Sequence, residues 1–275
     1  MELPIAKQSY LPSTDTLVRA IKRAAVILAR TAAEETQLDG ATVFVNARRP
    51  GVRMINLATD LNIPGGATAD GVLAQVFDHF REASVPCHAL RCAETQWPKP
   101  LADAAEQAGY QRAASTVFLL DKFKRPGSFR DDLQVIPGRA AYAELRRLHR
   151  RDAVARWNAD DRLADDLADT HIDFYDESRL DSFLGRLAGQ PAGVVNVLTL
   201  GNIGVITDVH TDHEHRRQGV ARTLLTHAIE HCQRAAFEQV VLEAPEDCGI
   251  ERALYESLGF KAVATFSAYE RPDHV

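Results

Sequence analysis

A basic turn that contains a glycine is the part of the sequence whose residue types and spacing could do chemistry. Residues 209–225 read VHTDHEHRRQGVARTLL. We expect a strand that ends near Thr211, a charged turn, and a helix that starts at Gly219. The apolar residues of that helix recur with the spacing of a helix packed on a sheet; they are Ala221, Leu224, Leu225, Ala228, Ile229 and Cys232.

This turn has the properties of a diphosphate-binding site. The first turn of a helix leaves backbone N–H groups unpaired and carries partial positive charge. Gly219 has no side chain, so an anion can approach the backbone closely, and Ala221 is small. Arg216, Arg217 and Arg222 can bond phosphate oxygens. The alternative is an ordinary capped helix with a solvated basic turn, and the turn alone does not decide between the two.

Two motifs in sequence order resemble the GNAT superfamily of acyl-CoA-dependent N-acyltransferases. Arg216-x-x-Gly219-x-Ala221, after a strand and at the start of a helix, is similar to the pyrophosphate motif of that family. Residues 253–260, ALYESLGF, are similar to its second recognisable stretch. Residues 189–193 match the hairpin turn that usually precedes the cofactor-binding strand. The resemblance covers about residues 133–270 and implies the fold and activity of this superfamily.

The resemblance implies an N-acetyltransferase that moves an acetyl group from acetyl-CoA to a primary amine by direct attack, without a covalent enzyme intermediate. It implies that the pantetheine arm pairs with the end of a strand that splays from its neighbour. The residues of that strand end are Val209, His210 and Thr211. The pyrophosphate would lie beside Arg216, on the amides of Arg217, Gln218, Gly219, Val220, Ala221 and Arg222.

Two residues are candidates for the proton transfers. The resemblance assigns Tyr255 as the donor to the leaving CoA thiolate, which departs with negative charge. We expect the side chain of Tyr255 to point about 100° away from the buried stripe of its helix, at Leu254, towards the cleft. The alternative is a core tyrosine. Some members of the family place a carboxylate at the position of Glu243, which would deprotonate the amine, since an amine is mostly ammonium at neutral pH. Its alternative is a rim carboxylate paired with an arginine, and Asp208 is a second candidate base.

The sequence departs from the family pattern at three positions. Cys248 replaces an asparagine that often touches the cofactor, His213 replaces a common proline, and Thr211 stands at a usually apolar position. The first departure weakens any claim of a contact at that position. His210, His213 and His215 could be drawn as a metal site, but ligands on a strand end and a turn would not easily converge. We expect a polar rim there and no metal.

Helices and strands alternate in two halves around these motifs. In the first half we expect helices over 14–37, 69–83 and 100–108 and strands over 42–46, 52–57, 86–92 and 114–120, with a hairpin at 48–51. Charge, Pro126 and Gly127 mark residues 121–132 as a connection. In the second half we expect helices over 139–156, 160–171, 219–235 and 249–258 and strands over 132–136, 181–188, 192–200, 203–210, 238–244 and 261–269.

The two halves look like copies of one unit. Aligning Gly109 with Gly259 puts Ala105 at the position of Tyr255, and the glycine turn at 64–69 carries no arginine. We therefore expect an α/β fold of two GNAT-like units, each a mixed, mostly antiparallel sheet flanked by helices. A degenerate domain would cover residues 1–125 and shape the acceptor cleft, and a catalytic N-acetyltransferase domain would cover residues 131–275.

Composition narrows the function classes. The chain has 275 residues, of which 45% are hydrophobic, and 38 acidic residues against 32 basic ones give a net charge of −6. That balance is wrong for a general nucleic-acid binder, which needs a basic surface. No apolar run approaches the ~20 residues of a membrane-spanning helix. The four cysteines form no C-x-x-C pair, so we expect reduced thiols in a cytoplasmic protein.

The expected partner is a small-molecule or peptide amine, with neither nucleic acid nor membrane; the sequence leaves the oligomeric state open. The rival hypothesis is a non-catalytic CoA-sensing or protein-interaction module on the same fold. Tyr255, which the first half lacks at Ala105, favours the enzyme, because a binding module has less need of a proton donor.

Overall fold

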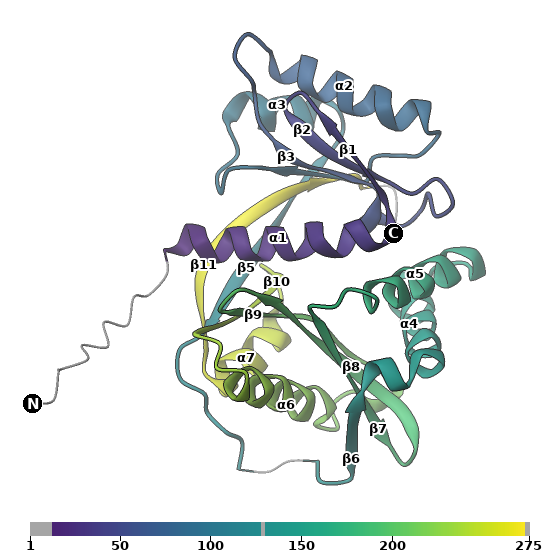
Figure 1. Cartoon of the computed structure of the whole chain (residues 1–275), viewed down its shortest axis with the longest axis vertical. Helices are drawn as coiled ribbons and strands as arrows, with labels where there is room; N and C mark the ends of the chain where they lie inside the picture. The colour runs from purple at the N-terminus through teal and green to yellow at the C-terminus, as the bar shows by residue number, and fades with distance from the viewer. Residues whose placement is uncertain (1–12, 128–129, 273–275) are drawn as a thin grey trace, which may run out of the picture.

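Figure 1 shows the computed structural model of the chain, which describes residues 13–127 and 130–272. Residues 1–12 and 273–275 of the two predicted domains, and 128–129 of the predicted connection, lie outside the described residues. The described strands form one eleven-stranded sheet in the order β1-β2-β3-β4-β11-β5-β10-β9-β8-β7-β6. Eight of its ten pairings are antiparallel, and β3–β4 and β9–β10 are parallel. The predicted α/β class and the mixed, mostly antiparallel sheet are confirmed.

Most predicted elements lie where the sequence placed them. The helices of the first half are α1 (Thr14–Ala32), α2 (Ala69–Glu82) and α3 (Lys99–Gln107), and its strands are β1 (Glu34–Leu38), β2 (Ala41–Val45), β3 (Leu57–Leu61), β4 (Ala89–Cys92) and β5 (Gln111–Leu120). The helices of the second half are α4 (Tyr142–Trp157), α5 (Asp161–Phe174), α6 (Val220–Arg234) and α7 (Gly249–Leu258). Its strands are β6 (Leu133–Pro137), β7 (Leu180–Leu187), β8 (Gln190–Leu200), β9 (Ile203–Thr211), β10 (Gln239–Pro245) and β11 (Phe260–Glu270).

The prediction was wrong at the end of the first helix. The helix stops at Ala32, and β1 occupies residues that were predicted as its last turn. β1 pairs with β2 around Asp39-Gly40, where Gly40 has a φ of 87°. An Asp-Gly pair supplies the left-handed backbone that a tight hairpin needs, and this turn signal outweighs helix propensity in the residues before it.

The predicted hairpin at 48–51 is also displaced. β2 and β3 do pair antiparallel, but the second strand begins at Leu57 rather than at Val52. Asn56 is fully buried, accepts a hydrogen bond from the Asn46 backbone N–H, and donates to the Arg49 and Val52 carbonyls. Because these bonds hold residues 46–56 as a loop, the strand can start only after Asn56.

The backbone repeats its left-handed positions in the two halves. Such positions follow α2 and α3 in the first half and α6 and α7 in the second, and they also occur inside β3 and β9. The pairs and their φ values are Asp60 (55°) and Asp208 (51°), Ser84 (56°) and Ala236 (57°), and Gly109 (86°) and Gly259 (100°). A left-handed φ is uncommon for a residue other than glycine, so the repetition agrees with two copies of one fold.

The two halves exchange their last strands. In the repeat, β5 corresponds to β11 and β4 corresponds to β10. Yet β5 pairs with β10 of the second half, and β11 pairs with β4 of the first. β5 and β11 also pair with each other along their whole length. Each half therefore depends on a strand from the other to complete its part of the sheet.

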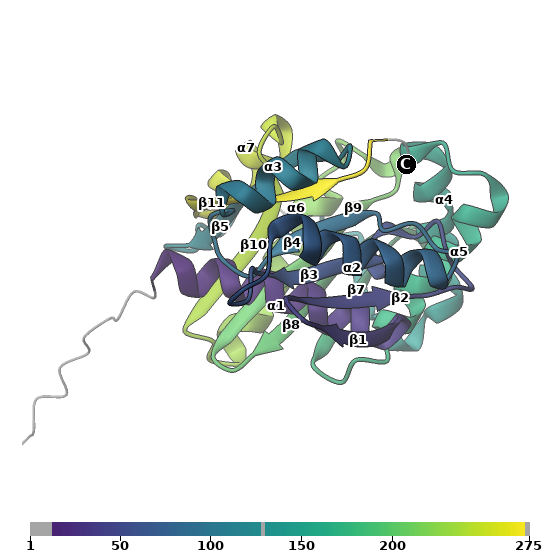
Figure 2. The same cartoon turned by 90° about the horizontal axis from the view of Figure 1, so that it is seen from above.

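The helices form layers on the two faces of the sheet (Figures 1 and 2). α6 and α7 pack on one face of the second half, while α4, α5 and the first half's α1 pack on the other. α2 and α3 cover the first half. The four cysteines are buried and unpaired. Among the described residues, no helix combines the length and apolarity that a membrane crossing requires.

Candidate active site

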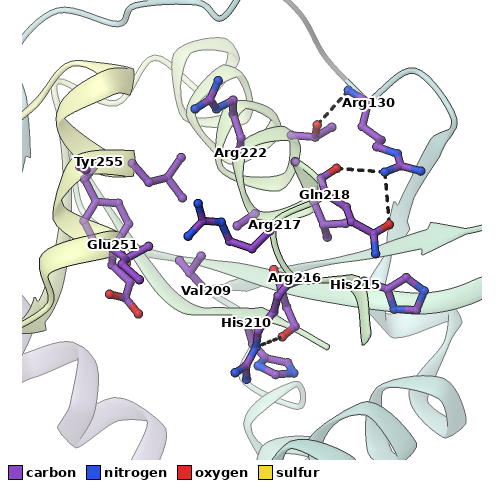
Figure 3. Close-up of a pocket in the computed structure, with 18 of the residues that line it drawn as sticks. Arg130, Val209, His210, His215, Arg216, Arg217, Gln218, Arg222, Glu251 and Tyr255 are labelled. Carbon is purple, nitrogen blue, oxygen red and sulfur yellow. Dashed lines mark hydrogen bonds between the residues drawn. The ribbon is translucent and has the colours of Figure 1, made fainter. Parts of the chain in front are cut away.

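The basic turn and the strand before it line one cleft of about 1090 Å³. It lies where α6 begins, between the end of β9 and α7 (Figure 3). The structure brings together all ten residues that the sequence predicted to bind the cofactor: Val209, His210, Thr211, Arg216, Arg217, Gln218, Gly219, Val220, Ala221 and Arg222. Tyr255 lines the same cleft.

The start of α6 presents its backbone to the cleft. Gly219 precedes the helix with a φ of 83°, and no side chain caps the helix at this residue. A side-chain Cβ at Gly219 would have no heavy atom within 4 Å, so this position is open. Arg217 also has a left-handed φ of 60°. An uncapped helix start with arginines around it is suited to an anion, because the first N–H groups lack intrahelical partners.

Arg130 was missed by the sequence analysis. Its backbone N–H donates to Thr223 Oγ1 (3.3 Å), and its guanidinium donates to the Gln218 carbonyl (3.1 Å), as Figure 3 shows. Arg130 thus ties the connection between the halves to the turn, and its guanidinium also forms an ion pair with Asp132 (2.7 Å). It lies far from the motif in sequence, and only its charge within the connection could have signalled it.

β9 and β10 separate at the level of the cleft. Their pairing ends at Ile206–Leu242, although both strands continue. Beyond that point β9 pairs only with β8, and β10 only with β5. The edge of β9 that faces β10 is therefore free over residues 207–211. In the first half, β3 and β4 still pair at Leu61–Cys92, so the equivalent gap is closed.

Tyr255 lies between this cleft and a second cavity. Its side chain is only 6% exposed, and its ring packs against Phe118 (5.4 Å between centroids) and Phe260 (6.3 Å). The expectation that Leu254 forms the buried stripe was wrong: Tyr255 and Leu258 are the buried residues of α7, and Leu254 is half-buried. The tyrosine is a core residue that also lines both cavities.

The second cavity, of about 580 Å³, is lined mainly by side chains from α1, α4, α5, β9, the end of β10 and α7. Glu243 lines this cavity and not the cofactor cleft. Its side chain is exposed and forms no ion pair with any described residue, so the paired-rim alternative is not observed. Five residues line both cavities and so lie where the two meet: Arg156, Val209, His210, Glu251 and Tyr255.

Asp208 is the most perturbed carboxyl of the second cavity. Its side chain is 19% exposed and accepts one hydrogen bond, from Asn196 Nδ2 at 3.3 Å. The nearest ring nitrogens, His149 Nε2 and His171 Nδ1, are 3.7 and 3.6 Å from Oδ2. Burial, with Asp152 nearby, raises the pKa of Asp208 to about 8. No arginine or lysine among the described residues forms an ion pair with it.

The histidines around Asp208 are neutral. Burial lowers the pKa of His171 to about 4 and, helped by His171, that of His210 to about 3. Burial also holds the pKa of His149 well below its usual range. His149 Nε2 shares a hydrogen bond of 2.7 Å with the Tyr175 hydroxyl. The neutral imidazoles give the Asp208 carboxyl no positive charge, and Arg156 is the nearby cation that opposes the rise of its pKa.

The predicted histidine set does not converge. His210 faces Asp152 (3.4 Å), His213 faces Asp212 (3.2 Å), and His215 lines the cofactor cleft. The described residues do place a different set together, His149, His171 and Asp208, with ligand atoms within 4.8 Å of one another. The two imidazoles are stacked, however, at 3.9 Å and 1°. A metal bonds a histidine in its ring plane, and parallel planes share no point, so this arrangement does not suit one ion.

A family model for the acetyltransferase (GNAT) family matches residues 142–260. The chain contains a GNAT acetyltransferase domain. The match spans α4 to the start of β11 and so includes the basic turn, the splayed strands and α7.

Known proteins similar to the chain agree with this GNAT domain. An uncharacterized N-acetyltransferase, YsnE, of Bacillus subtilis is 37% identical over 75 residues, which are 26% of the chain; the chain spans about half the length of this relative. A GCN5-related N-acetyltransferase from Kribbella flavida has a TM-score of 0.61 at 16% identity, over 94% of the chain and 97% of that protein. A tandem GNAT protein from the clavulanic acid biosynthesis pathway has a TM-score of 0.54 at 16% identity, over 83% and 77%. At an identity of 16%, the likeness to these two structures shows the fold alone.

Asp208 should weaken the fold of the GNAT domain at alkaline pH. A carboxyl whose pKa is raised in the folded state favours unfolding as pH rises from about 4, its unfolded value, to about 8. Asp208→Asn removes that charge, so the variant should melt about 2–8 °C above the wild type at pH 8 and close to it at pH 4.5. Thermal melts at both pH values measure this, with the exposed Asp161→Asn as control. An equal difference at the two pH values would show that Asp208 is not strained by its charge.

Proposed function

We propose that the GNAT domain is an acetyl-CoA-dependent N-acetyltransferase that acts on a primary amine. The observation that carries the proposal is the position of Tyr255, between a basic cleft at a helix start and a second cavity whose lining contains five carboxyl groups and two arginines. A proton donor placed between an anion site and an amine site is what acyl transfer from a thioester requires. A module that only binds CoA would not need this arrangement.

Acetyl-CoA is the proposed co-substrate. The N–H groups at the start of α6, with Arg216, Arg217 and Arg222, would hold its pyrophosphate, and the free edge of β9 at Val209 to Thr211 would pair with the pantetheine amides. The open space at Gly219 supports this fit, because an anion there meets no side chain. The thioester supplies the activated acetyl group.

Two residues carry the proton transfers in the proposed reaction. Glu243 takes a proton from the bound ammonium, and the neutral nitrogen attacks the thioester carbonyl. The C–S bond then breaks, Tyr255 gives its proton to the thiolate, and the acylated nitrogen releases its extra proton, which restores the tyrosine hydroxyl. Burial and Glu251 raise the pKa of Tyr255 to about 12, so the hydroxyl keeps its proton at neutral pH. Asp208, which forms no ion pair with an arginine or lysine among the described residues, holds the ammonium as it enters when its carboxyl is ionised.

We propose that residues 1–125 form a degenerate GNAT-like domain and residues 131–275 the catalytic one. Three observations support inactivity of the first. Ala105 stands at the position of Tyr255, β3 and β4 leave no gap, and Thr68 Oγ1 caps the start of α2 by accepting from the Gly71 N–H (3.1 Å). Its contribution is structural: α1 and η1 (Arg53–Ile55) supply part of the wall of the second cavity.

CoA should raise the melting temperature through the turn at Gly219. At a concentration of 100 Kd a ligand stabilises by about 2.7 kcal/mol, which is a rise of about 5–10 °C. Gly219→Val should reduce the rise below about 1 °C, because the added side chain projects where the pyrophosphate would lie. Gly66→Val is a matched control, since Gly66 also has a left-handed φ (86°) and open space before a helix; it should keep the full rise. An unchanged rise in Gly219→Val would refute the phosphate assignment.

Release of free CoA thiol from acetyl-CoA, measured against a panel of primary amines, tests the activity itself. Amine-dependent release supports the acetyltransferase. A chain that binds CoA but releases no thiol with any amine would support the binding-module alternative.

A further inference from the structure

The second cavity is lined by two chemically different groups of side chains. One group, the polar end, gathers around Asp208 and includes His149, His171 and His210. The other, the apolar end, comes from both halves of the chain: Ala25, Leu28, Met54, Trp157, Leu167 and Phe174. Further charged side chains also line the cavity: Arg91, Asp152, Arg156, Glu243, Asp247 and Glu251. A cavity lined in this way suits a ligand that carries a charge at one end and a hydrocarbon group at the other.

The apolar end is only partly covered by protein. Leu28 on α1, Met54 on η1 and Trp157 at the end of α4 belong to the main core but are only half-buried. Leu167 and Phe174 of α5 are buried and complete the wall. Apolar surface that faces a cavity gains free energy when a hydrocarbon group displaces water from it.

The polar end leaves polar atoms without hydrogen-bond partners. Asp208 accepts a single bond of 3.3 Å, and its histidine neighbours are neutral. The Nε2 atom of His210, a residue that is 7% exposed, has no hydrogen-bond partner among the described residues. An ammonium or amine nitrogen brings N–H donors that can pair with such atoms, and buried polar groups are normally paired.

We propose that the acceptor is a small primary amine with an uncharged hydrocarbon body, bound with its nitrogen among Asp208 and the histidines and its body against the wall that the two halves share. This inference rests on the proposed function, because it names the acceptor of that reaction. Through Leu28 and Met54, the first half would take part in choosing the acceptor.

A series of linear amines tests the proposal on the full chain. Ethylamine, propylamine, butylamine and pentylamine differ only in methylene count, and kcat/KM is measured for each by thiol release at saturating acetyl-CoA. Each buried methylene should raise kcat/KM roughly fourfold, which gives roughly 60-fold from ethylamine to pentylamine. The diamine 1,5-diaminopentane should be at least tenfold poorer than pentylamine, since its second ammonium would meet the apolar wall.

Variants test which side chains cause the dependence of kcat/KM on the length of the amine. Met54→Gln keeps the side-chain length but adds polar atoms. It should reduce the gain in kcat/KM between the longest amines of the series. Leu28→Asn provides a second test on another element should one variant fold poorly. Val154→Asn, on an exposed residue of α4 outside both cavities, should keep the slope of the series.

The outcomes separate the two proposals. Measurable turnover that does not vary with chain length, or a preference for the diamine, would overturn the hydrocarbon acceptor and leave acetyl transfer standing. If no amine is acetylated, the proposed function fails. The wall is then tested by amine affinity in the presence of CoA: a Kd that falls from ethylamine to pentylamine supports it, and an equal Kd overturns it.

Discussion

Tyr255→Phe should lower kcat at saturating acetyl-CoA by roughly 10²–10⁴-fold, the usual effect of losing a positioned general acid. The substitution removes one hydroxyl and keeps the ring, whose contacts with Phe118 and Phe260 hold it in the core. Stability and CoA affinity should therefore change little. Steady-state rates of thiol release measure the effect, and a CoA titration of the same variant reports binding separately.

The pH dependence of this variant carries further information. Because the Tyr255 pKa is raised to about 12, the hydroxyl of the wild type stays protonated across the range from pH 6 to 10. A more basic medium supplies no proton donor, so raising the pH should not restore Tyr255→Phe. Tyr110→Phe is a matched control: it also removes a buried hydroxyl, one that donates to the Cys87 carbonyl in the first half, and it should leave kcat unchanged. Full activity of Tyr255→Phe would transfer the donor role to water.

Local signals made the elements around the site predictable. Helical spacing located α6 and α7, and Gly219 and Gly259 marked the start of one and the end of the other, where the structure has left-handed φ values. All of the predicted cofactor residues lie within seventeen consecutive positions of the chain, 209–225. A turn and the helix after it fix their own geometry, so such a site can be derived from a short stretch of sequence.

The second cavity could not be derived in this way. His149, His171 and Asp208 come from three elements, and their meeting depends on how α4 and α5 cross the sheet. The apolar wall needs α1, which belongs to the other half. The exchange of β5 and β11 is also invisible in the sequence, because β5 has the same alternation of side chains whichever strand lies beside it. The predicted direction of the Tyr255 side chain was wrong for a related reason. Which face of α7 is buried depends on Phe118, a residue of the exchanged strand.

Glu243→Gln and Asp208→Asn should affect different steps of the reaction. If Glu243 takes the proton, Glu243→Gln should lower kcat by roughly 10²–10⁴-fold at pH 7. Its rate should recover about tenfold per pH unit, because the fraction of neutral amine rises that way below an amine pKa of about 10.4. Asp208→Asn should instead raise the KM for the amine. Both effects follow from pH profiles of kcat and KM in the full chain.

The pKa of Asp208 determines whether the KM for the amine rises or falls with pH. The side chain is neutral below about pH 8 and charged above it, so in the wild type the KM for a cationic amine should fall as pH rises through 8. Asp208→Asn should abolish that fall, since an amide carries no charge at any pH. Glu246→Gln, which removes another exposed carboxylate that lines neither cavity, should change neither profile. Suppose instead that Asp208→Asn causes the large loss of kcat and removes a change of rate near pH 8. The buried carboxylate of Asp208 would then be the base. Glu243 would then be a residue of the rim, because only one of the two carboxylates can accept the proton that the ammonium loses.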